Sequence, residues 1–131
     1  MTAYNWDLIE RLLHEAQNSA GKAFEPRLYA TELAEELERA GEHIESLDHL
    51  RIEATQYESA LVKGGFIENR PESEGGNGEN FVLTARGLQL LSMVDSSFPG
   101  DEHPREVLDE AGTAALTPEV FDDLAPKANL T

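Results

Sequence analysis

Four histidines are the residues whose chemistry would be easiest to recognise: His14, His43, His49 and His103. No two of them form a pair four residues apart on a predicted helix, and no His-Glu-x-x-His run occurs. A histidine pair four residues apart and a His-Glu-x-x-His run are the arrangements by which a helix binds zinc. His43 and His49 are six residues apart around a predicted helix start, which is not a chelating spacing. The spacing therefore predicts solvent-exposed or cap-region histidines, with no bound metal and no other cofactor.

The motifs that carry nucleophiles or bind phosphates are missing as well. The sequence has no Gly-x-Ser-x-Gly elbow, no Gly-x4-Gly-Lys-Ser/Thr loop and no dinucleotide-binding fingerprint. Its glycine-rich segment at residues 75–78 lies between Glu74 and Glu79, which would repel a phosphate group. Carboxylates are so numerous that an acid/base pair is expected by chance. We therefore expect a protein that is not an enzyme and has no small-molecule substrate.

Charge is the strongest signal in the composition. The 131 residues include 10 Lys+Arg and 26 Asp+Glu, which gives a formal net charge of −16. Such a surface keeps a protein in solution and repels phosphate backbones and anionic membranes. Adaptation to a salty cytoplasm would also explain it, as would ordinary solubility. The sequence lacks cysteine, a signal peptide and any run of roughly 20 apolar residues that could span a bilayer. We expect a cytoplasmic protein that makes no membrane contact.

The elements that would position a site follow from apolar spacing and capping residues. Two helices are predicted at residues 5–20 and 31–40, with a connector or short edge strand around Pro26 between them. A third helix is predicted to begin at Ser46, to continue unbroken through Thr55, and to end at Gly64-Gly65. A fourth helix, capped by Thr84, is predicted to turn three apolar side chains towards the core: Leu88, Leu91 and Val94.

A hairpin is predicted between the third and fourth helices. Phe66-Ile67 and Phe81-Val82-Leu83 read as its strands, and the polar segment 69–79 reads as a flexible loop. Residues 1–95 are therefore expected to form one domain. Residues 96–131 are expected to be a linker and an acidic C-terminal helical extension, with helical segments at 104–111 and from Thr117-Pro118 to a stop at Pro126.

Four stretches together resemble a prophage-associated winged-helix-like family of unknown function. They are Asn5-Trp-Asp-Leu-Ile-Glu-Arg-Leu-Leu13, Tyr57-x3-Leu61-x2-Gly-Gly-Phe-Ile67, Leu83-Thr84-x2-Gly87-x2-Leu90-Leu91 and Leu116-Thr-Pro-Glu-Val-Phe-Asp-Asp-Leu-Ala125. More broadly, the order helix, hairpin, helix resembles a winged helix-turn-helix domain. The resemblance implies a mainly helical α+β fold, with a winged-helix domain, a small β-hairpin wing and a C-terminal helical extension. It also implies a phage or mobile-element setting, with no activity attached.

Winged helices commonly place the third helix in the major groove and the hairpin loop against the DNA backbone. Three basic residues are the candidates for such contacts: Arg51, Lys63 and Arg70. The same helix is expected to expose three acids: Asp48, Glu53 and Glu58. A DNA binder usually neutralises several phosphates. Three basic residues beside three acids are few for this task. A DNA-binding transcription regulator, working in a high-salt cytoplasm, is therefore the alternative hypothesis and not the preferred one.

The preferred hypothesis is a regulatory or adaptor protein that binds another protein. The acidic C-terminal extension carries apolar side chains that could dock in a partner's groove: Val120, Phe121 and Leu124. The same side chains could instead pack on the chain's own helices or across a homodimer. A lower-ranked variant is DNA mimicry, in which carboxylates on the second and third helices occupy a nucleic-acid-binding groove.

Overall fold

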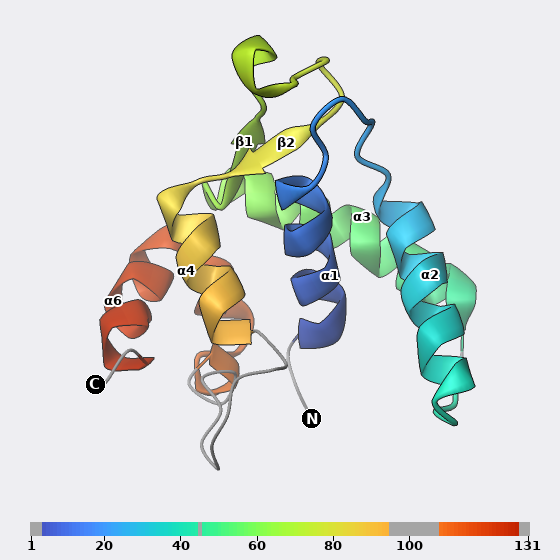
Figure 1. Ribbon diagram of the computed structural model, residues 1–131. Coiled ribbons are helices and arrows are strands. Elements are labelled where there is room, and N and C mark those ends of the chain that lie inside the picture. Colours follow the sequence, from blue (N-terminus) through green and yellow to red (C-terminus); the bar gives the residue numbers. More distant parts are fainter. Residues whose placement is uncertain (1–3, 45, 95–107, 129–131) are drawn as a thin grey trace.

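The computed structural model describes residues 4–44, 46–94 and 108–128, with side chains described up to residue 124. Its fold is mainly helical α+β (Figure 1). The elements in chain order are α1 (Trp6–Gln17), α2 (Pro26–Arg39), α3 (Leu47–Lys63), β1 (Ile67–Asn69), the 3-10 turn η1 (Glu72–Glu74), β2 (Phe81–Leu83), α4 (Ala85–Val94), η2 (Gly112–Leu116) and α6 (Pro118–Ala128).

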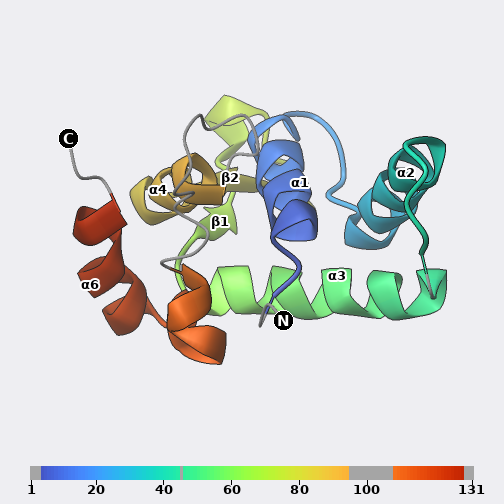
Figure 2. The same ribbon diagram turned by 90° about the horizontal axis from the view of Figure 1, so that it is seen from below.

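Helix α3 forms one side of the molecule. Figure 2 shows α1, α2, α4 and the hairpin all on the same side of α3, so that the opposite side of α3 faces away from them. The core lies between these elements. It contains the fully buried side chains of Leu12 on α1, Leu61 on α3 and Leu90 on α4. No helix among the described residues has the length and apolar character needed to cross a bilayer.

Three capping residues confirm the predicted helix starts. Asn5 Oδ1 accepts a hydrogen bond from the Leu8 amide at 3.1 Å, and Ser46 Oγ accepts one from the His49 amide at 3.1 Å. Thr84 Oγ1 accepts from the Gly87 amide at 3.1 Å. Each bond satisfies a backbone donor that the first helical turn leaves without a partner. As predicted, α3 is a single helix.

The segment around Pro26 differs from the prediction. Pro26 is the first residue of α2, which therefore begins five residues earlier than predicted from Thr31. A proline is well suited to this position because the first turn needs no amide hydrogen from it. Helix α1 is also shorter than the predicted range of residues 5–20, because it ends at Gln17. Ala20 lies beyond this end and is exposed, whereas Leu8, inside the helix, is fully buried.

Two predictions about the later helices also need correction. Leu91 and Val94 are buried as predicted, but Leu88 is 50% exposed. The buried stripe of α4 instead runs through Gly87 and Leu90, and Leu88 lies to one side of it. Helix α6 continues through Pro126 to Ala128 instead of ending there, because a proline inside a helix removes one amide donor without always ending it.

The hairpin forms close to where the sequence predicts it: β2 matches, but β1 begins at Ile67 and not at Phe66, and it includes Asn69, which the sequence predicts to be in the loop. The strands are antiparallel, with Ile67 opposite Leu83 and Asn69 opposite Phe81. The Gly21 amide donates to the Gly75 carbonyl at 2.8 Å, and the Phe24 amide donates to the Glu79 carbonyl at 2.8 Å. The loop therefore packs against the connection between α1 and α2. No local pattern in the sequence indicates these contacts, because the partners are distant along the chain, and the flexibility of the loop stays a prediction.

The described part of the C-terminal segment packs on the rest of the chain. Phe121 is fully buried, and its ring meets that of Phe66 edge to face at 5.0 Å. Trp6 Nε1 donates to Asp109 Oδ1, and Tyr4 Oη donates to the Thr113 carbonyl at 2.6 Å. The predicted linker at residues 96–100 lies outside the described residues, as does the first half of the predicted helix at 104–111, of which residues 108–110 are helical.

Candidate functional site

A cleft lies between α1 and α2. Its volume is about 480 Å³, and its lining comprises Asp7, Glu10, Arg11, His14, Glu15, Leu33, Glu36 and Leu37. The amphipathic pattern of α1 directs its polar residues to this cleft because the opposite stripe is buried in the core. Leu33 and the half-buried Leu37 supply an apolar wall from α2.

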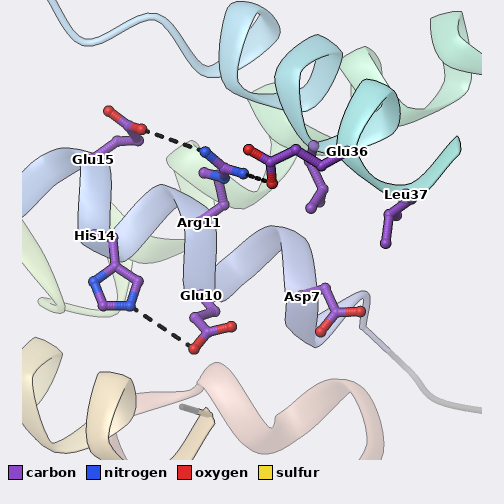
Figure 3. Close-up of a pocket in the computed structure, with 8 residues that line it drawn as sticks. Asp7, Glu10, Arg11, His14, Glu15, Glu36 and Leu37 are labelled. Atoms are coloured by element: carbon purple, nitrogen blue, oxygen red, sulfur yellow. Dashed lines mark hydrogen bonds and ion pairs between the residues drawn. The ribbon is translucent and has the colours of Figure 1, made fainter. Parts of the chain in front are cut away.

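Arg11 is the central cation of this cleft. Figure 3 shows its guanidinium between Glu15, from the same helix, and Glu36, from α2. Arg11 Nη2 donates to Glu36 Oε2, and Arg11 Nη1 lies 3.8 Å from Glu15 Oε1. On the other side of the helix, His14 Nε2 lies 3.8 Å from Glu10 Oε2. Four carboxylates and one arginine therefore line the cleft.

The chemistry available in the cleft is the binding of cationic groups. Among the described residues, no group of three or more histidine, aspartate or glutamate side chains could hold a metal ion. An apolar wall beside carboxylates matches a side chain or helix that carries both aliphatic and cationic groups. The residues of the cleft were visible in the sequence only as part of a general acid excess, since nothing local indicates that α1 and α2 form a cleft.

The outer face of α3 is the second candidate surface. We define it as Ile52, Thr55, Gln56, Ser59 and Val62, with Asp48 and Lys63 at its two ends. All seven residues are exposed, and they lie opposite the buried stripe of Leu50, Ala54, Tyr57 and Leu61. In Figure 2 the labelled helices and strands lie on the other side of α3, and the unlabelled orange segment that contains η2 lies beside its C-terminal end. Ile52 is 48% exposed and Val62 is 43% exposed.

Two of the three acids that the helix is expected to expose, Glu53 and Glu58, are only partly exposed. The side chain of Glu53 is only 22% exposed, lies 3.2 Å from His49 Nε2, and accepts a hydrogen bond from Tyr57 Oη at 2.7 Å. Glu58 is half-buried. Only Asp48 is exposed as expected, and the centre of the face carries uncharged side chains. The outer face of α3 is therefore less acidic than the sequence suggests.

Burial raises the pKa of the Glu58 carboxyl above its usual value of 4.5. A raised pKa in the folded state means that ionisation of Glu58 opposes folding. This penalty is absent below pH 4.5, where the carboxyl is protonated in both states, and it develops as the pH rises through the folded-state pKa.

We therefore expect Glu58→Gln to raise the urea midpoint of unfolding at pH 7, and the gain to disappear below about pH 4.5. Paired urea titrations at about pH 7 and pH 4 measure this difference. Glu68→Gln is the matched control, because Glu68 is exposed on β1 and the change removes the same charge there. A gain from Glu58→Gln that persists unchanged at the lower pH would show that the buried charge is not its cause.

The three candidate DNA-contact residues do not form one cationic patch. Arg51 Nε donates to Thr31 Oγ1 at 3.0 Å, and Arg51 Nη1 lies 3.5 Å from Asp48. Lys63 is exposed at the other end of α3, twelve residues or about 18 Å along the helix axis. Arg70 donates to four backbone carbonyls: Phe81, Glu74, Ala16 and Gln17. Its guanidinium is therefore directed into the protein.

The three candidate partner-binding residues lie on α6, which packs against α4. Phe121 is fully buried in the core, whereas Val120 and Leu124 are partly buried. Arg86 fixes the helix with hydrogen bonds to both carboxylate oxygens of Asp122, at 2.9 Å and 2.7 Å. These bonds hold the pKa of Asp122 below its usual value. The apolar side of α6 thus packs on its own chain.

Comparison of the chain with protein-family models, with curated proteins and with solved structures finds no match.

Proposed function

We propose that the chain is a non-enzymatic winged-helix protein that acts as a regulator or adaptor by binding a basic protein partner through acidic helix faces. Helices α1–α3, the hairpin and α4 follow one another in the order expected of a winged helix, with the β1–β2 loop as the wing. An origin in phage or mobile DNA, which the resemblance implies, stays a prediction.

The observation that carries the proposal is that most of the described arginines are already paired within the chain. The structure describes the side chains of eight of the ten lysines and arginines, all except Arg105 and Lys127. Five of these eight are engaged with acidic side chains or backbone carbonyls: Arg11, Arg39, Arg51, Arg70 and Arg86. A polyanion would meet few available cations on a chain of net charge −16, whereas a basic protein would be attracted by that net charge.

The cleft between α1 and α2 is where we expect this partner to bind. Its carboxylates would face lysine and arginine side chains, while Leu33 and Leu37 would contact the apolar residues of the same segment. A helix with one cationic and one aliphatic side fits both features. The expected partner is therefore a protein with an exposed basic amphipathic helix.

Fluorescence anisotropy with a labelled basic amphipathic helical peptide tests this proposal. We expect the double variant Glu15→Gln/Glu36→Gln to weaken binding by about tenfold or more, because it removes two carboxylates and leaves Arg11 to repel the peptide. The matched control is Glu72→Gln/Glu74→Gln, which changes the net charge equally at exposed positions of the hairpin loop. We expect the control to change binding by less than about twofold, since it lies outside the cleft.

Equal weakening by both double variants would show that the peptide responds only to overall charge, and the cleft would then not be the site. Circular dichroism checks that both double variants remain folded. Only a modest loss of stability is expected from either change, because exposed ion pairs contribute about 0–1 kcal/mol.

A DNA-binding transcription regulator is the second candidate, and one observation favours it. The centre of the outer face of α3 carries Thr55, Gln56 and Ser59, which are uncharged side chains able to contact base edges. Under this alternative, mixed-sequence duplexes bind at low salt, binding weakens as salt rises, and Lys63→Ala reduces it. Unchanged duplex anisotropy at about 50 mM salt over many sequences would remove this candidate.

A further inference from the structure

We propose that the outer face of α3 is the contact surface between two copies of this chain, with the two α3 helices antiparallel about a twofold axis. This surface is separate from the cleft between α1 and α2, so the inference does not depend on the proposed function.

Exposed aliphatic side chains mark this face. Among the described residues, four large hydrophobic side chains are strongly exposed: Leu28, Ile52, Val62 and Leu88. Two of them, Ile52 and Val62, lie on the outer face of α3, ten residues or about 15 Å apart along its axis. In Figure 2 the labelled helices and strands leave this face uncovered, and the unlabelled orange segment that contains η2 lies beside only the C-terminal end of α3, where Lys63 lines a hollow with Thr113 and Leu116. Burying such side chains removes apolar area from water and favours association.

The arrangement along α3 is self-complementary, as a twofold interface requires. A twofold axis at the level of Tyr57 places Ile52 of each copy opposite Val62 of the other, because both are five positions from residue 57. The same axis places Thr55 opposite Ser59 of the second copy, so that hydroxyl groups meet near the centre. Aliphatic side chains would therefore contact aliphatic side chains twice, and no acid would lie between them.

Charge at the two ends of the face indicates an antiparallel pair. Asp48 lies one turn before Ile52, and Lys63 directly follows Val62. Antiparallel packing brings Asp48 of each copy within about one turn of Lys63 of the other, whereas parallel packing would place like charges together. Lys63 has no ion pair among the described residues, and Asp48 has one weak pair, with Arg51 at 3.5 Å. Both can therefore turn to a second copy.

A second copy fits this face better than a polyanion or a basic protein does. Lys63 is its single cation and is offset by Asp48, so a phosphate backbone would find no net attraction there. A basic protein would find stronger attraction at the cleft, which has four carboxylates against one arginine. A face without net charge is instead where two strongly acidic molecules repel each other least.

Salt should strengthen this dimer. The overall charge of −16 opposes self-association at low ionic strength. Dissolved ions screen that long-range repulsion and also the exposed Asp48–Lys63 pairs, which contribute little to the free energy of association, whereas the aliphatic contacts between Ile52 and Val62 do not weaken in salt. The opposite dependence is expected of duplex binding, which weakens as salt rises. The direction of the salt effect therefore distinguishes the two uses of this face.

Sedimentation equilibrium of the full chain, from about 10 to 200 µM and at about 50 mM and 500 mM NaCl, tests the inference. We expect a monomer–dimer equilibrium that is roughly threefold tighter, or more, at the higher salt concentration. Ile52→Glu and Val62→Glu are each expected to weaken it about tenfold or more. The matched control is Leu88→Glu, which adds the same charge at an equally exposed position on α4 and should change it less than the α3 variants do.

Cross-linking gives a second measurement that does not rely on destabilising variants. The chain has no cysteine, so an introduced one is the only thiol. A short bismaleimide should link two copies of Gln56→Cys, which lies near the proposed axis, and should link Gln89→Cys, exposed on α4, much less. A monomer at the highest protein and salt concentrations would overturn the inference. So would a dimer that survives Ile52→Glu, or equal cross-linking from the two positions.

Discussion

Replacing Phe121 with alanine is expected to lower the free energy of unfolding by about 3–5 kcal/mol, the usual range for removing a buried phenylalanine. The side chain is fully buried, and its ring packs edge to face against Phe66 at 5.0 Å. Alanine would leave a cavity between α6 and Phe66, the residue that precedes β1. A loss of this size would show that residues 118–124 belong to the same core as α1–α4.

Urea unfolding followed by tryptophan fluorescence measures this loss, because Trp6 is the only tryptophan and is 4% exposed. Leu88→Ala is the control, since Leu88 is 50% exposed and its truncation should change stability by no more than about 0.5 kcal/mol. If Phe121→Ala were as mild as Leu88→Ala, α6 would not be a stable part of the core. Its apolar side chains would then again be candidates for partner binding.

Replacing Arg70 with alanine is expected to lower the free energy of unfolding by about 2–3 kcal/mol. Its guanidinium donates to the carbonyls of Ala16 and Gln17 at 3.0 Å and to those of Phe81 and Glu74 at 3.1 Å. Hydrogen bonds to a charged group contribute about 1.5–3 kcal/mol each, but neighbouring bonds are not additive and water can replace some of them. The positive charge also stabilises the C-terminal end of α1.

Urea titration and amide hydrogen exchange together test the role of Arg70. Protection of the Gly21 and Phe24 amides should fall, because both donate to carbonyls of the hairpin loop that Arg70 holds. Arg27→Ala is the control, since Arg27 is exposed on α2. Arg70→Lys should recover only part of the loss, because an ammonium cannot reproduce the planar fork. Full stability in Arg70→Ala would show that the loop is held by its backbone bonds alone.

The Arg70 contacts also decide how the DNA-binding alternative should be tested. A loss of duplex binding in an Arg70 variant would have two explanations, a lost phosphate contact or a displaced loop. Lys63 is exposed and forms no ion pair among the described residues, so Lys63→Ala is the cleaner test. The same residue takes part in the proposed dimer, and sedimentation of that variant separates the two effects.

Much of the local structure could be predicted from the sequence. Asn5, Ser46 and Thr84 cap helices as expected, β2 lies where a short apolar run predicts it, and β1 begins one residue later than predicted. The caps depend on hydrogen bonds between residues only a few positions apart. Short-range sterics and capping chemistry are therefore enough to specify where these helices begin.

Only the tertiary structure decided which charges and apolar side chains remain available for contact. Arg70 reaches carbonyls on α1 that are more than fifty residues away, and Phe121 packs on Phe66. Glu53 and Glu58 are only partly exposed on α3, while Leu88 is exposed to solvent. The sequence by itself determined the overall acidity, the order of elements and the absence of recognisable catalytic motifs. Burial and charge pairing depend on which distant segments come together, and no local pattern in the chain specifies that.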